Sequence, residues 1–111
     1  MAQPIGGYKL NNKLNANIIL ELQEKWEHTD KNTIMDNLER FLIAKYPECR
    51  GFDTKLEKLM DISGVKKHTV YAWVNRSREN VKVPFLKLCE IAKALDVDVD
   101  ILLSHAEKVG E

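Results

Sequence analysis

The spacing of the apolar residues constrains this chain more than any other feature of its sequence. From about residue 18 to residue 103 they recur every three or four positions, the period of amphipathic α-helices. No run alternates between apolar and polar residues over the length of a strand. The chain has 111 residues, enough for one compact core and too few for two ordinary domains. The sequence therefore predicts an all-α fold around a single core.

Turn and capping residues divide the chain into six helical segments. Thr33 with Asp36, and Thr54 with Glu57, have the spacing of capping pairs at the start of a helix. Gly64 suits a tight turn because glycine adopts positive φ without strain. The expected segments, in chain order, are about 16–28, 33–46, 54–63, 67–75, 84–95 and 98–103, after an N-terminal arm.

Composition places the chain among globular proteins. Hydrophobic residues make up 44% of it and charged residues 31%, and no apolar run approaches the roughly 18 residues of a membrane helix. Residues 1–7 show no basic cluster followed by an apolar core, so no secretory signal is visible. We expect a cytoplasmic protein with no membrane partner.

Residue types that carry chemistry are scattered along the chain. Cys49 and Cys89 lie forty positions apart, without a second Cys or His at metal-ligand spacing. Cys89 fits an apolar helix face and is expected to be buried, whereas Cys49 is expected to be a loop thiol. The histidines at 28, 68 and 105 form no cluster, and no nucleophile elbow, phosphate loop or zinc-protease motif is present. We expect no enzyme, no catalytic residue, no metal and no cofactor.

The charge is unevenly distributed although it sums to zero, with 17 bases and 17 acids. Residues 66–82 contain five bases and one acid, a net charge of plus four, whereas residues 83–111 have a net charge of minus three. A local basic segment is either a solvated surface or the contact surface for a polyanion.

Two short helical patterns separated by Gly64 meet at the start of this basic segment. Val65 and Val70 are expected to hold the second helix against the first, and Trp73 is expected in the core. The outer face of the second helix would then carry Lys66, Lys67, His68, Tyr71, Ala72 and Asn75. A helix that exposes such hydrogen-bonding side chains suits the major groove of DNA.

The stretch resembles the Cro/CI (XRE-type) helix-turn-helix family. The residues that carry the resemblance are Leu59, Ser63, Gly64, Val65, Thr69, Val70, Trp73 and Asn75, then Pro84, Leu88, 91–95, Val97 and 101–103. The resemblance implies a five-helix lambda-repressor-like helix-turn-helix bundle over 34–104, with the helix from about 67 to 75 as recognition helix. Residues 1–33 would be an N-terminal arm and extra helix outside the family pattern, and 105–111 a tail.

The resemblance also implies which residues contact DNA. The expected base-reading residues are Lys66, Lys67, His68 and Ala72. The expected backbone contacts are Thr69, Tyr71, Asn75, Arg76, Arg78 and Lys82. For Tyr71, a phosphate contact, a contact to a base methyl group and ordinary packing are all open.

The expected function is a sequence-specific double-stranded DNA-binding transcriptional regulator, with repression the commoner outcome in such proteins. It would act as a homodimer on an inverted repeat, in a bacterial or phage-infected cell, where it would be associated with the nucleoid. The alternative is a protein-interaction module on the same scaffold: an antitoxin, or a phage or plasmid accessory factor for replication, transfer or recombination. The N-terminal helix would then bind a protein partner; otherwise it covers its own core or pairs with a second copy.

Overall fold

A computed structural model describes residues 12–104, and within this range the chain is mostly helical, with loops between the helices and without a strand. The all-α prediction is confirmed for these residues, whereas the expected tail and most of the arm lie outside them. No helix in this range combines the length and apolarity needed to cross a bilayer. The elements are α1 (Asn12–Glu27), α2 (Lys31–Lys45), the 3-10 turn η1 (Pro47–Arg50), α3 (Phe52–Ser63), α4 (Lys67–Val74), α5 (Phe85–Leu95) and α6 (Val99–Leu103).

Two helices begin earlier than their capping pairs predicted. The N-cap of α2 is Asp30, so Thr33 and Asp36 lie inside the helix, and so does the expected domain boundary between 33 and 34. The N-cap of α3 is Gly51, and the hydroxyl of Thr54 donates to backbone carbonyls at 48 and 51 instead of capping the helix. Both capping predictions were wrong, because each helix begins about three residues earlier in the chain than its capping pair indicates. Asp98 stands at the N-cap of α6, without a capping hydrogen bond from its side chain.

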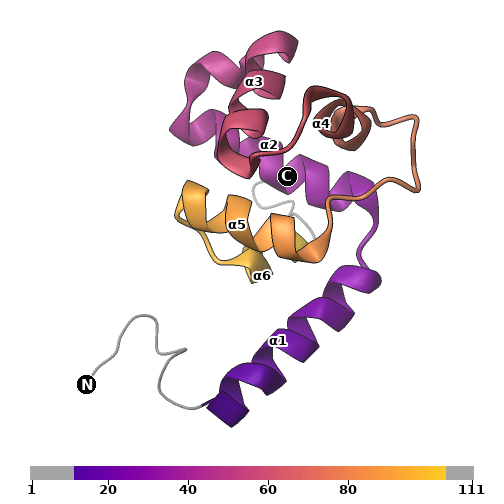
Figure 1. Cartoon of the computed structure of the whole chain (residues 1–111), viewed down its shortest axis with the longest axis vertical. Helices are drawn as coiled ribbons and strands as arrows, with labels where there is room; N and C mark the ends of the chain where they lie inside the picture. The colour runs from indigo at the N-terminus through magenta and orange to yellow at the C-terminus, as the bar shows by residue number, and fades with distance from the viewer. Residues whose placement is uncertain (1–11, 105–111) are drawn as a thin grey trace, which may run out of the picture.

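The helix α2 lies across the middle of the bundle, where η1, α5 and α6 contact it, while α3 contacts α4 and α5 (Figure 1). Val70 and Trp73 are buried in this core, as predicted. The other buried apolar residues are Ile34, Met35, Leu38, Leu42, Cys49, Leu56, Leu59, Val74, Val83, Phe85, Leu88, Ile91, Ala92, Leu95, Leu102 and Leu103.

The helix α1 projects from the bundle and contacts it through α6 and through its own C-terminal end (Figure 1). The indole Nε1 of Trp26 donates to the carbonyl of Val83 at 2.8 Å, and Lys25 pairs with Asp100 on α6 at 2.7 Å. No residue from 17 to 27 is buried. This helix therefore covers the core only at one end.

The burial of the two cysteines differs from the prediction: Cys49 is buried and Cys89 is partly exposed. Cys49 is fully buried, with its Sγ 3.9 Å from the carbonyl oxygen of Thr54, because the expected loop is the packed turn η1. Cys89 lies at the edge of the buried face of α5 and is only partly covered. Burial raises the pKa of both thiols, which disfavours the reactive thiolate form.

The backbone at Gly64 gives a first test of the fold. Gly64→Ala should lower the free energy of unfolding by about 1 kcal/mol, the cost of a Cβ in the left-handed region. Nothing lies within 4 Å of the position that this Cβ would take, so the loss comes from the backbone alone. Gly64→Asn should cost less because asparagine tolerates this conformation, and Asp96→Gly, at φ 63, should stabilise. Urea denaturation measures all three, and equal losses for Ala and Asn would contradict the assignment.

Candidate nucleic-acid interface

The turn between α3 and α4 is fixed by a left-handed glycine and a serine. Gly64 ends α3 with φ 70 and ψ 19, and its N–H donates to the carbonyl of Met60 at 2.8 Å. The hydroxyl of Ser63 donates to the carbonyl of Leu59 at 2.6 Å and accepts from the N–H of Val65 at 3.3 Å. These bonds satisfy groups that the end of α3 would otherwise leave unpaired, so α4 begins in a defined direction.

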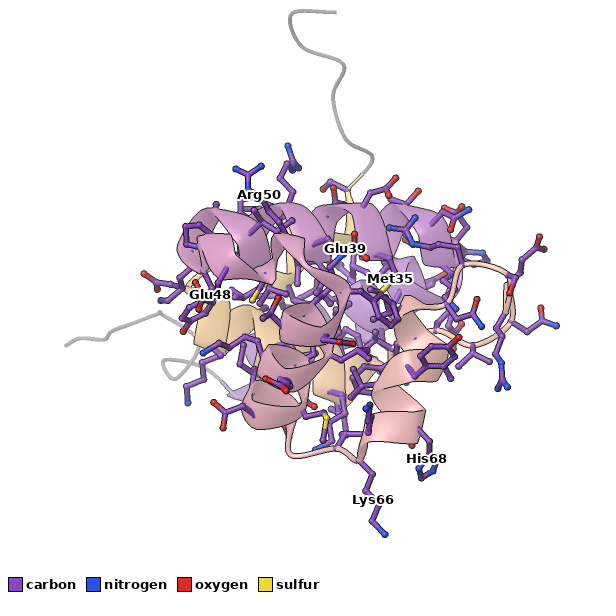
Figure 2. The ribbon with its side chains drawn as sticks, turned by 90° about the horizontal axis from the view of Figure 1, so that it is seen from above. Met35, Glu39, Glu48, Arg50, Lys66 and His68 are labelled. Atoms are coloured by element: carbon purple, nitrogen blue, oxygen red, sulfur yellow. The ribbon has the colours of Figure 1, made fainter. Side chains whose placement is uncertain are left out.

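One face of α4 is buried and the opposite face is open. Val70, Trp73 and Val74 pack into the core. Lys66, Lys67 and His68 are exposed at the start of the helix, and Thr69 and Ala72 are partly covered. Figure 2 shows Lys66 and His68 projecting away from the body of the protein at this end of α4. The predicted base-reading residues thus come from one short helix and its N-cap.

Tyr71 packs on Phe52, a residue that the sequence analysis did not single out. The two rings meet edge to face, with centroids 5.8 Å apart at 85°. Tyr71 nevertheless keeps 42% of its surface exposed. Phe52 stands at the start of α3, in a stretch that was expected to be a connector. Packing of Tyr71 is therefore observed, and its exposed part remains available for contact.

A buried lysine holds the end of α4 and the loop after it. The Nζ of Lys31, at the start of α2, donates to the carbonyls of Ala72 at 2.8 Å, Asn75 at 2.6 Å and Arg78 at 2.7 Å. Lys31 is only 4% exposed. Burial lowers its pKa, and the charges of Arg76 and Arg78 lower it further, whereas the three carbonyls favour the ammonium form. This ammonium connects α2 to the predicted DNA-binding segment.

Arg76 is engaged within the protein instead of facing solvent freely. Its guanidinium pairs with Asp36 at 2.9 Å and with Glu39 at 3.4 Å, both on α2. The side-chain oxygen of Asn75 accepts from the N–H and the hydroxyl of Ser77. The side chains of Asn75 and Arg76, expected to contact phosphates, thus stabilise the loop itself.

Lys82 is likewise engaged, at the end of α1. Its Nζ donates to the carbonyls of Trp26 at 2.7 Å and Thr29 at 2.9 Å and lies 4.3 Å from the centroid of the Trp26 ring. Burial lowers the pKa of Lys82, although the nearby carboxylates of Glu27 and Asp30 oppose this shift. The side chain fixes α1 on the loop, a role that its position in a basic segment did not indicate.

The ten predicted residues thus divide into two groups. Lys66, Lys67, His68 and Arg78 are exposed cations or donors, and Thr69, Tyr71 and Ala72 lie among them on α4. The side chains of Asn75, Arg76 and Lys82 are bound within the protein. No protein-family model, curated protein or solved structure matches this chain.

Replacing Lys31 tests the contact that holds this surface in place. Lys31→Met should lower the free energy of unfolding by about 2 kcal/mol, because it leaves three carbonyls in part-buried hydrogen bonds without their donor. Lys45→Met is the matched control: it removes an exposed lysine at the other end of α2 and should change stability by less than about 0.5 kcal/mol. Urea denaturation at neutral pH gives both values, and similar losses would show that Lys31 is not a structural anchor.

Proposed function

We propose that this chain is a sequence-specific double-stranded DNA-binding transcriptional regulator that reads the major groove with α4. The observation that carries the proposal is the arrangement of α4: its apolar face is buried and its start exposes Lys66, Lys67 and His68. In this proposal α2 to α6 form a lambda-repressor-like helix-turn-helix bundle of the Cro/CI type, with α3 and α4 as the two helices of the motif. The extra helix is α1.

The chemistry of the exposed residues fits such a surface. The major groove admits an α-helix, and guanine presents O6 and N7 acceptors there to lysine and other donors. Lys67 and His68 are the proposed base readers, with Lys66 beside them at the N-cap of α4. Exposed cations such as Arg78 would neutralise phosphates and release counterions. Tyr71, supported by Phe52, would contact the backbone or a base methyl group.

The internal contacts of the loop support this assignment indirectly. Lys31 and Arg76 hold residues 72–78 against α2, so the end of α4 and the following loop have a fixed shape. A reading helix discriminates between bases only when its position is fixed, because phosphate contacts set the register and base contacts read the sequence. We therefore assign Arg76 and Lys82 to the support of the surface and not to DNA contact.

The proposed protein acts as a homodimer on an inverted repeat, in the cytoplasm of a bacterial or phage-infected cell. Two-fold symmetry would place the centres of the half-sites about 34 to 36 Å apart, or at a multiple of this spacing. Repression by occupying a promoter is the simplest outcome for a chain of this size.

A protein-interaction module is the second candidate, and the observation that favours it is the exposed apolar surface of α1, which includes Ile19 and Leu20. Such a module would use the same bundle as an antitoxin or as an accessory factor for replication, transfer or recombination. A module that acts only through a protein partner predicts no preference among DNA sequences, whereas an accessory factor that also binds DNA would differ from the regulator in the genomic position of its site.

Selection of bound duplexes from a random-sequence pool separates the two candidates. The regulator should enrich an inverted repeat, and the Lys67→Ala/His68→Ala double variant should lose that enrichment while remaining folded by circular dichroism. These two residues are exposed, so their removal leaves the core unchanged. Absence of enrichment by the folded wild-type protein would remove the sequence-reading proposal.

Two arginines of the same loop provide a matched comparison. Arg78→Ala should weaken binding to all duplexes alike and make the slope of log K against log salt less negative, by about one per bound subunit. Arg76→Ala should leave that slope unchanged, because its guanidinium already pairs with Asp36 and Glu39. Fluorescence anisotropy between 50 and about 200 mM salt measures both. Equal changes in slope would mean that Arg76 leaves its carboxylates to contact DNA.

A further inference from the structure

The middle of α1 exposes two large apolar side chains. Ile19 is 50% exposed and Leu20 is 63% exposed, and they stand at the midpoint of Asn12–Glu27. Burying a leucine side chain is worth about 1.5 to 3 kcal/mol, so this position favours contact with another molecule. In an antiparallel pair of identical helices that overlap along their whole length, the two-fold axis crosses at the midpoint. A residue on the axis meets its own copy, and a residue before the axis meets one after it.

The charges of α1 are segregated in the way that an antiparallel pair requires. Residues 12–20 contain one charged residue, Lys13. Residues 21–27 contain Glu21, Glu24 and Glu27, with Lys25 already paired to Asp100 on α6. Antiparallel pairing sets the half that contains Lys13 and no acid against the half of the other copy that contains three glutamates, and it also opposes the two helix dipoles favourably. Parallel pairing would set the glutamates of the two copies against each other.

The orientation of α1 is compatible with two α4 helices that face the same side. In Figure 1, α1 runs across the plane of view and α4 is seen nearly end-on. Figure 2 is turned by 90° from Figure 1. In it, Lys66 and His68 project along the direction from which Figure 1 is viewed. A two-fold axis along this direction would pair α1 with its copy in antiparallel order and leave both α4 helices facing one side.

We infer that α1 is a self-association surface, which pairs with α1 of a second copy of this chain in antiparallel order about Leu20. The pairing itself depends on α1 alone; its use on an inverted DNA repeat rests on the proposed function. Stable interfaces bury about 1,200 Å² or more, whereas this pairing uses a single helix from each copy. The dimer is therefore weak in free solution and depends on protein concentration.

Sedimentation of the full-length chain without DNA tests the surface. The wild-type protein should shift from monomer to dimer as its concentration rises, and Leu20→Glu should weaken dimerisation at least tenfold because it sets two carboxylates against each other. Leu86→Glu is the control, since Leu86 is an exposed leucine on α5, and it should leave the equilibrium unchanged. A wild-type monomer at all concentrations, or equal effects of the two variants, would overturn the inference.

Disulfide trapping tests the antiparallel order, in a Cys89→Ser background that leaves only the buried Cys49. Leu20→Cys should form a disulfide-linked dimer by itself. Asn17→Cys and Gln23→Cys, one turn to either side, should cross-link with each other in a mixture but not alone. Cross-linking of each variant with itself would indicate parallel pairing and overturn the inference. These measurements use no DNA, so their failure is distinct from a failure of sequence selection, which would remove only the proposed function.

Discussion

The arrangement of the open surface depends on one buried ammonium, that of Lys31. The last carbonyls of a helix have no partner within it and carry partial negative charge, and α4 is only eight residues long, so its end is a large part of the element. Lys31 donates to the carbonyls of Ala72 in α4, Asn75 at its C-cap and Arg78 in the following loop, at 2.6 to 2.8 Å. A buried charge is tolerated only where such bonds compensate for its lost hydration. The burial of the Lys31 ammonium therefore depends on the present shape of the loop. The loop in turn keeps this shape through its hydrogen bonds to Lys31.

A second lysine repeats this arrangement in the opposite direction. Lys82, in the loop after α4, donates to the carbonyls of Trp26 near the end of α1 and of Thr29 just after it, and lies over the Trp26 ring. Both α1 and α2, which residues 28–30 connect, are thus joined to the segment 72–82. Lys82 of this segment donates to α1, and Lys31 of α2 donates to the segment. This use of charge explains why the net charge of 66–82 overstates the cations available to a partner: Lys82 and Arg76 neutralise groups of the protein itself.

The sequence predicted what local signals determine and missed what distant contacts determine. Helical periodicity placed all six helices, and Gly64 marked the turn before α4 because only backbone conformation decides that position. The caps at Thr33 and Thr54 failed, since packing moved the helix starts. The role of Lys31 was invisible because a lysine in a polar stretch normally faces water, and its partners lie more than forty residues away. The same holds for Arg76, whose carboxylates are on α2.

These anchors also bear on how two copies would work together. Trp26 bonds to the carbonyl of Val83, and Lys82 bonds to the end of α1, so α1 is tied to the chain directly before α5. Lys31 ties the end of α4 to the start of α2, and only three residues, 28–30, separate α2 from α1. The direction of α1 relative to α4 is therefore set by hydrogen bonds on both sides of a short connection. If α1 joins two copies, this fixed direction would determine the distance between their α4 helices and hence the spacing of the half-sites they can read.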